Sequence, residues 1–511
     1  KFYEGEALGN YFKKKMKISV FGLVTNTPNS SFGWGDVYKY GLNNEFNREE
    51  NEDGGFNMSY SNSSPQGIPQ TIKSGFYYTD KLSKNTKLNI NYSYNSSDIV
   101  SKTTKNSQYF LTDTSYTSAN LTQAKQKNEA HAINIGLEQR IDSLTDFNFS
   151  SKIKLINSNA ASSDETDFLT NDNIKTRNTT INNSSKSTGY DVANNLKLLK
   201  RFKKKDRLLT LNYSNTFSKN TSDGILKTDN YSYADSSAFL TSVNQKKEGE
   251  NDNQSHFGGI SYIEPITKKI KIEASYDIMY YNSKQDKNAY NNIGGEYNQL
   301  DSTLTNNFKN TKQINRVGLK FIYEVKKMRF TIGTKARNVF VNNNNIFKDQ
   351  HITQNFNNVL PFSTLRYKFS DNNVLEVRYT TRSQNPTISQ LQPVKDNSNP
   401  NFINIGNPNL LPTFQHAINL NYNSWKSVSG KYTWMGLTYN YTNNDIANSS
   451  TYDSIGRTLS QAVNVNGNYN ISGYIGTSMP FFSKKLEVGP NLWASYTDNK
   501  SYINNLENTT Q

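Results

Sequence analysis

Apolar and polar residues alternate one by one over many stretches of this 511-residue chain. Over residues 87–95, every even position holds Leu, Ile or Tyr and every odd position holds Lys, Asn or Ser. Similar alternation occupies 209–217 and 270–278. A period of two places successive side chains on opposite faces of a β-strand, whereas a helix needs a period near 3.6. The pattern therefore predicts an all-β chain.

Short turn-like segments separate these strands about every 60 residues, which indicates one supersecondary unit used many times. Nine turns with a strand on each side predict about 18 strands in an up-and-down arrangement. The nine turns centre near Lys14, Ser83, Ser143, Lys204, Lys268, Lys326, Asp371, Val428 and Ser483.

Long polar segments lie opposite the short turns in this arrangement. A strand crosses a bilayer with about 10 residues, so each repeat retains a long remainder rich in Asn, Ser, Thr and Asp. By the rule that periplasmic turns are short and outer loops are long, these segments are predicted to be extracellular. Alternation persists over 109–116, so we expect strands that project beyond the membrane. The segments are 106–128, 158–190, 218–255 and 282–312.

The composition favours a membrane β-barrel over a soluble β-sheet protein. Hydrophobic residues make up 34% of the chain, against roughly 45–50% in soluble domains. Disorder is excluded by 33 Tyr, 27 Phe and 4 Trp. A barrel with a polar lumen and aromatic girdles explains both facts. We therefore predict a large antiparallel transmembrane β-barrel in the bacterial outer membrane, and no transmembrane helix.

Both ends of the sequence are predicted to lie inside a larger barrel. Residues 1–12 already alternate as a strand, and 498–511 resemble an outer loop. A closed barrel pairs its first strand with its last. We expect residues 1–511 to be one barrel domain truncated at both ends, with about 22 strands when complete, the size of plugged outer-membrane transporters.

The net charge of +15 first suggests a nucleic-acid or anionic-membrane partner. The lysine clusters at 13–17, 203–207, 268–271 and 484–485 all fall in predicted turns. The favoured interpretation is an ordinary ring of turn lysines at one rim, and the alternative is a phosphate-rich partner such as the headgroups of outer-membrane lipid and lipopolysaccharide. We expect no nucleic acid.

Common catalytic motifs are missing from the sequence. There is no cysteine, and the four histidines, His131, His256, His351 and His416, are far apart. No HExxH, Gly-rich phosphate loop or GxSxG occurs. We therefore expect no enzyme activity, no catalytic residue, no cofactor and no metal site.

One predicted outer loop, residues 382–412, is rich in proline and turn residues. Its order of motifs resembles a loop late in the barrel of TonB-dependent receptors, with Arg-x-x-x-Pro, Leu-x-Pro and Gly-Asn-Pro-x-Leu-x-Pro in succession. Thr413 stands where the family usually has Glu. Short likenesses at 35–37, 80–83 and 141–144 point to the barrel subfamily common in Bacteroidota. The matching residues are Arg382, Pro386, Leu391, Pro393, Gly406, Asn407, Pro408, Leu410 and Pro412.

This resemblance implies an importer of a bulky ligand such as a metal chelate, peptide or glycan. It also implies a plug domain upstream of Lys1, a TonB-type energy coupler, and a surface lipoprotein or other outer-membrane subunits as candidate partners. For the motif residues themselves, an architectural role in fixing the loop is favoured over ligand contact.

Four charged residues are candidates for the lumen. Lys335, Arg337, Glu376 and Arg378 fall on the polar faces of their strands, where they line a ligand path or form a structural ladder. The alternative function is a non-transporting structural or scaffold barrel subunit of an outer-membrane assembly or secretion complex, because fold does not fix function. A scaffold requires neither a plug nor a TonB box upstream.

Overall fold

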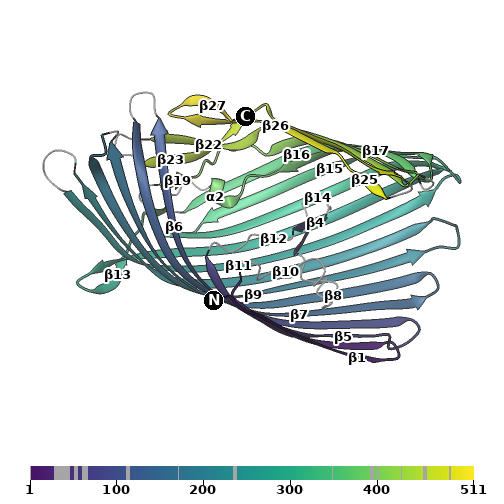
Figure 1. Ribbon diagram of the computed structural model, residues 1–511, viewed down its shortest axis with the longest axis horizontal. Helices are drawn as coiled ribbons and strands as arrows, with labels where there is room; N and C mark the ends of the chain where they lie inside the picture. The colour runs from purple at the N-terminus through teal and green to yellow at the C-terminus, as the bar shows by residue number, and fades with distance from the viewer. Residues whose placement is uncertain are drawn as a thin grey trace.

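The chain forms one large curved β-sheet in the computed structural model (Figure 1). The structure describes all residues except 1, 28–46, 51–55, 60–66, 111–114, 171, 234–238, 348, 392–395, 400–401, 427–428, 453–456, 483–484 and 511. Within the described residues, the helical element is the single turn α2 (Ile388–Leu391). No helix in this part of the chain is long and apolar enough to cross a membrane.

Eighteen strands pair antiparallel, each with the next along the chain, which confirms the predicted strand number. The first nine are β1 (Glu4–Lys13), β2 (Met16–Thr25), β5 (Ile68–Asp80), β6 (Thr86–Phe110), β7 (Ser115–Asp142), β8 (Thr145–Thr170), β9 (Lys175–Arg201), β10 (Leu208–Ser232) and β11 (Phe239–Pro265). The second nine are β12 (Ile270–Ile293), β14 (Asn306–Val325), β15 (Met328–Asn345), β16 (Gln350–Ser370), β17 (Asn373–Gln384), β20 (Thr413–Lys426), β21 (Lys431–Asn443), β24 (Asn468–Phe481) and β26 (Asn491–Ile503).

Several shorter strands pair with this sheet or lie beside it. A separate hairpin joins β3 (Asn47–Glu50) to β4 (Phe56–Ser59). At the end of the sheet opposite the short turns, β19 pairs parallel with β23, and β22 pairs with β23 and β26. The remaining short strands are β13 (Glu296–Leu300), β18 (Asp396–Asn399), β19 (Phe402–Ile405), β22 (Asp445–Tyr452), β23 (Thr458–Val465), β25 (Leu486–Val488) and β27 (Leu506–Thr510).

All nine predicted turns fall between consecutive strands. The turn at Lys14 joins β1 to β2, and the turn at Ser143 joins β7 to β8. Val428 and Ser483 themselves lie outside the described residues, but strands end and begin on either side of both. The period of about 60 residues read from the sequence is therefore the real repeat of the sheet.

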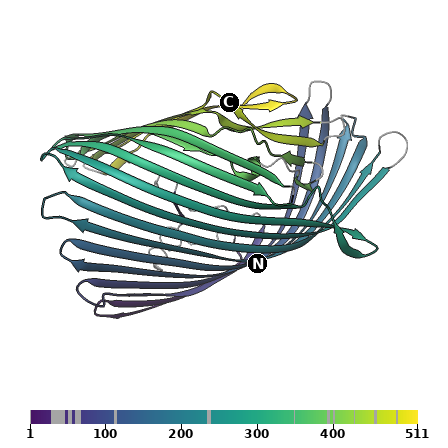
Figure 2. The ribbon, with the colours of Figure 1, turned by 180° about the vertical axis from the view of Figure 1, so that it is seen from behind.

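The long outer segments are mostly continuations of the crossing strands. Strands β6 to β11 have 24 or more residues each, and β7 has 28, against about 10 needed to cross a bilayer. Near one tip, the rings of Tyr109 and Tyr116 stack with centroids 4.6 Å apart. The expectation that strands project beyond the membrane is confirmed, and Figure 2 shows these elongated hairpins from behind.

The two faces of the sheet differ as the alternation predicts. On β14, the side chains of Val317 and Leu319 are 59% and 58% exposed, whereas those of Ile314 and Arg316 on the other face are 1% and 2% exposed. Apolar side chains on the outside and buried or polar ones on the inside are the arrangement of a membrane barrel.

The sheet has two edges within the described chain. Strand β1 pairs with β2, and β26 pairs with β24, β22 and β27, but no pairing between described residues joins β1 to β26. In Figure 1 they lie at the lower and upper sides of the curved sheet. The total of about 22 strands therefore stays a prediction.

Asp142 organises the tight turn between β7 and β8. Its carboxylate accepts hydrogen bonds from the Leu144 backbone N–H at 2.6 Å and from the Thr145 hydroxyl at 2.8 Å. The Lys200 ammonium lies 3.2 Å from the same carboxylate. Because the Leu144 N–H, then Thr145 and Lys200, stabilise the ionised form, the pKa of Asp142 falls from 3.8 to about 2.

This turn predicts a pH-dependent difference between the protein and Asp142→Asn. A carboxyl whose pKa is lowered by folding contributes stability above its ordinary pKa near 4, and that contribution is lost as pH falls towards 2. The turn is exposed to solvent, so we expect a small effect. Thermal unfolding at pH 6 should show the variant melting below the native protein, and the gap should close near pH 2. A gap independent of pH would contradict this role of the carboxylate.

Candidate functional site

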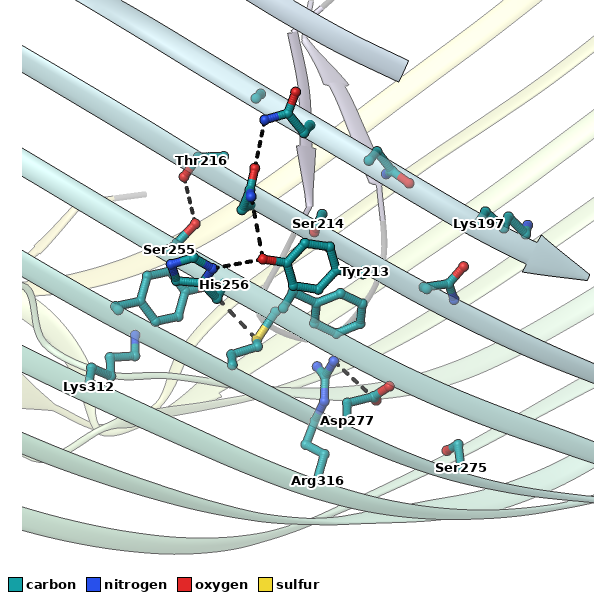
Figure 3. Close-up of a pocket in the computed structure, with 18 of the residues that line it drawn as sticks. Lys197, Tyr213, Ser214, Thr216, Ser255, His256, Ser275, Asp277, Lys312 and Arg316 are labelled. Atoms are coloured by element: carbon teal, nitrogen blue, oxygen red, sulfur yellow. Dashed lines mark hydrogen bonds and ion pairs between the residues drawn. The ribbon is translucent and has the colours of Figure 1, made fainter. Parts of the chain in front are cut away.

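A cavity of about 2300 Å³ lies against the inner face of the sheet. Residues of the main strands from β6 through β20 line it, together with the start of the proline-rich segment. Figure 3 shows part of its wall. Large concave sites with convergent polar groups are the default position for a ligand.

The proline-rich segment leaves the wall at the end of β17. Strand β17 pairs with β16 only as far as Thr380, but with β20 up to Gln384. Asn385 and Pro386 are buried and line the cavity. The segment called an outer loop from the sequence therefore begins at the wall of the lumen.

A reciprocal pair of hydrogen bonds closes the turn of α2. The Thr387 N–H donates to Gln390 Oε1 at 2.8 Å, and the Gln390 N–H lies 3.4 Å from Thr387 Oγ1. This is the pattern of a capping box. Leu391 follows, 2% exposed, and packs in one apolar cluster with Leu410, Ala462 and Ile446.

The return half of the segment is fixed by asparagine side chains. Asn407 donates its backbone N–H to Gln390 O at 2.5 Å and its side-chain amide to Ala462 O at 3.0 Å. Asn464 accepts from the Leu411 N–H at 2.8 Å and donates to Leu411 O at 3.0 Å. These bonds tie the segment to β23, which sequence alone did not identify as its partner.

The other motif residues occupy different parts of this segment. Arg382 and Pro386 line the cavity, and Gly406 is buried with its carbonyl accepting from Gln461 at 3.3 Å. Pro408 O lies 3.4 Å from Gln354 Nε2, and Pro412 is half-buried. Pro393 lies outside the described residues.

The four candidate lumen charges separate into two groups. Lys335 lines the cavity, and Arg337, 2% exposed on the same face of β15, donates to Ser383 O at 2.7 Å. Glu376 and Arg378 form an ion pair at 2.7 Å with each other and are not cavity-lining residues. The structure thus places Lys335 in the cavity wall and joins Arg337 to the backbone of Ser383, which also lines the cavity, whereas Glu376 and Arg378 lie outside the lining.

Basic side chains outnumber acidic ones among the residues that line the cavity, a feature that the sequence analysis did not predict. Eight Lys or Arg residues line it, against four Asp or Glu. Two acids are neutralised in place: Arg316 lies 3.3 Å from Asp277 (Figure 3), and Lys320 lies 2.5 Å from Glu273. The sequence shows these charged residues at the inward-facing positions of the alternating strands. It does not show which of them lie close together, because that depends on the register in which the strands pair.

Three tyrosine–histidine pairs bridge neighbouring strands, and the sequence analysis did not predict them. The Tyr–His distances from hydroxyl to Nδ1 are 2.9, 3.0 and 2.9 Å. Of these residues, Tyr213 and His256 are among those that line the cavity. The pairs are Tyr92–His131, Tyr213–His256 (Figure 3) and Tyr379–His416.

Comparison with known proteins agrees with this geometry. The sequence profile of the outer membrane protein beta-barrel family matches residues 200–511. No curated protein gives a significant match. The solved structure of the copper transporter OprC is similar with a TM-score of 0.52 and 12% identity, over 94% of this chain and 67% of OprC.

More distant likeness extends to the outer membrane transporter YddB from Escherichia coli, with a TM-score of 0.48 and 10% identity, over 96% of this chain and 60% of YddB. This chain thus spans about 60 to 67% of the length of these two transporters. At these identities the likeness shows the fold alone. Of the two structures, we base the fold comparison on OprC, whose TM-score is 0.52.

Proposed function

The chain belongs to the outer membrane protein beta-barrel family, and from this premise we propose that it forms the wall of a TonB-dependent transporter importing a bulky ligand. The single observation that carries the proposal is the segment from Arg382 to Pro412. Its motif order resembles that of TonB-dependent receptors; the segment begins at the cavity wall and contributes Leu391 and Leu410 to one apolar cluster. The proposal assigns transport and no catalysis to this chain.

An architectural role fits most of the motif residues. Leu391 and Leu410 fill the apolar cluster, and Asn407 bridges Gln390 to Ala462. Of the motif residues that the structure describes, Arg382, Pro386 and Leu391 line the cavity. We propose that the motif holds the rim of the lumen in place and that ligand contacts come from the wall.

The proposed transporter has further parts. Within a bilayer, unpaired backbone groups at the edges of β1 and β26 would each lose several kcal/mol, so we propose that additional strands complete the barrel. A plug domain would fill its lumen and connect to a TonB-type energy coupler. Outer-membrane lipid, lipopolysaccharide and a surface lipoprotein or other outer-membrane subunit are the remaining proposed partners.

Liposome swelling tests whether the lumen is gated. We expect the full-length protein in liposomes to admit no oligosaccharide, because a plug closes the lumen. A general porin in matched liposomes gives the positive control. Rapid swelling with the full-length protein would show an open pore and overturn the transporter proposal.

Binding of the energy coupler separates the transporter from a scaffold barrel. Purified TonB periplasmic domain should be retained by the full-length protein, because the proposed importer must be pulled from inside the cell. A scaffold barrel has no need of this contact. Absence of retention, alongside retention by a known TonB-dependent transporter, would favour the scaffold.

A further inference from the structure

Four neighbouring strands of the cavity wall carry amide and hydroxyl side chains in one row. In the strand register, Asn253 of β11 stands opposite Ser283 of β12, Ser283 opposite Asn310 of β14, and Asn310 opposite Asn343 of β15. Residues directly opposed in an antiparallel pair share one face of the sheet, and the first three of these line the cavity. The four residues are here named the amide row.

Two amides of this row make no hydrogen bond within the described part of the chain. Asn310 is 5% exposed and Asn343 is buried, and neither the carbonyl oxygen nor the NH2 group of either side chain has a partner there. By contrast, the Ser283 hydroxyl donates to Asn253 Oδ1 at 2.6 Å. A buried amide without a partner costs free energy. Because χ2 of asparagine has a broad profile, Asn310 can turn its amide towards the cavity without breaking a bond, and a ligand that bonds to it recovers this cost.

Two further amides of the same kind border the cavity elsewhere. Asn385, at the start of the proline-rich segment, is 8% exposed and lines the cavity, and both of its amide atoms lack a partner among the described residues. Asn134 on β7 is buried and lines the cavity, and its NH2 group is unpaired in the same sense. A carboxamide offers one acceptor oxygen and two N–H donors. Hydrogen-bonding capacity for a ligand therefore comes from three separate parts of the wall.

An apolar and aromatic surface adjoins the amide row on the side of the short turns. Tyr281 lies on β12 two residues nearer the turn, opposite Ser255, which Figure 3 labels. One step further, Phe257 stands opposite Met279, and Met279 opposite Ile314. Met279 and Ile314 belong to one buried apolar cluster, against which Phe257 and Tyr281 pack. Since both rings also line the cavity, the wall offers an apolar surface next to its amides.

We propose that the amide row and this apolar surface form the ligand site, and that the ligand is a neutral glycan. This inference rests on the proposed transport function. Each sugar hydroxyl is both a donor and an acceptor, as is each carboxamide, and the C–H face of a sugar ring can pack on apolar and aromatic side chains. An extended peptide has one N–H and one C=O per residue, so it offers fewer groups to such a row. The inference uses no charge on the wall.

A panel of hexamers tests the ligand class. The full-length protein in lauryldimethylamine oxide, a detergent without sugar, is titrated with maltohexaose, cellohexaose, laminarihexaose, mannohexaose, hexagalacturonate and hexaalanine, and binding is followed by thermophoresis. Ferric citrate is the metal-chelate probe. We expect one or more of the neutral hexasaccharides to bind at least tenfold more tightly than the other probes. Its affinity should change less than twofold between 50 and 500 mM NaCl, because salt screens charges and leaves neutral hydrogen bonds intact.

Two asparagines on one strand locate the site. Asn310→Ala should weaken binding of the tightest neutral glycan about tenfold, because the hydrogen bonds of a buried amide are lost. The free protein loses no hydrogen bond in this variant, so we expect it to fold. Asn315→Ala is the matched control: Asn315 lies on the opposite face of β14, accepts from the Tyr276 hydroxyl at 3.0 Å, and should change binding less than twofold. Asn385→Ala is a second site variant with the same expected loss as Asn310→Ala.

Three results would overturn the inference. They are tighter binding of hexaalanine, hexagalacturonate or ferric citrate than of every neutral glycan, binding of no probe at all, and equal effects of Asn310→Ala and Asn315→Ala. Liposome swelling and TonB retention do not depend on the chemistry of the ligand, so they report separately on the proposed function.

Discussion

Replacing Ile260 by arginine is expected to lower the free energy of unfolding by about 2–4 kcal/mol, the loss measured for a cation on the lipid face near the bilayer midplane. Ile260 is 44% exposed on the outer face of β11, between Leu211 and Tyr276 of the neighbouring strands. It lies five residues before Pro265, where β11 ends, near the middle of a crossing of about ten residues. Urea unfolding of the full-length protein in lipid vesicles measures the change.

The adjacent residue supplies the control. Ser261 points to the other face of β11 and lines the cavity, so Ser261→Arg places the same charge in a polar lumen. We expect a change within about 1 kcal/mol, as for ordinary substitutions at tolerant sites. Equal destabilisation by the two variants would show that Ile260 does not face lipid.

Replacing Leu410 by alanine is expected to destabilise the packing of the proline-rich segment against β23 by about 2–5 kcal/mol, because the substitution removes a buried side chain and leaves a cavity. Leu410 is 1% exposed and packs with Leu391 and Ala462. This cluster joins the proline-rich segment to β23, so the loss should appear as local release of that segment. Limited proteolysis of the full-length protein, with fragments identified by mass spectrometry, should show faster cleavage between residues 386 and 412.

Leu411→Ala is the matched control for this variant. The neighbouring leucine is 51% exposed, so its truncation should leave the cleavage rate nearly unchanged. Its backbone bonds to Asn464 persist in the variant, since they involve only the Leu411 N–H and C=O. Similar cleavage of both variants would mean that the apolar cluster does not fix the segment.

The local sequence pattern was sufficient to predict the strands of the sheet and the short turns between them. A period of two along 87–95 or 270–278 fixes the strand and its two faces, and turn-rich segments such as 141–144 fix the strand ends. Both signals are short-range, which explains why the strand number and all nine turns agree with the structure. The length of the hairpin extensions was only partly evident, because Asn- and Ser-rich stretches such as 182–187 resemble loops although β9 continues through them.

The site could be predicted only in part, because it depends on long-range pairing. The motif order marked Arg382 and Leu410, but the inward course of the segment depends on β23 and on Asn464, more than 50 residues later. The cavity wall contains both Lys152 and Arg382, which no local pattern connects. Lys335 could be predicted as a lumen residue because its position on the polar face of a strand follows from the local sequence. Its neighbours in space could not be predicted, because they come from strands far apart in the sequence.

Accessibility of single cysteines on intact cells tests the central claim, an outer-membrane barrel wall with its long hairpins outside and its short turns inside. The sequence contains no cysteine, so Asp172→Cys, at the exposed tip between β8 and β9, and Lys203→Cys, in the exposed turn between β9 and β10, give clean reporters. With a membrane-impermeant maleimide, we predict labelling of Cys at 172 on intact cells, and of Cys at 203 only after the outer membrane is permeabilised. Labelling of position 203 on intact cells, with position 172 protected, would contradict the account.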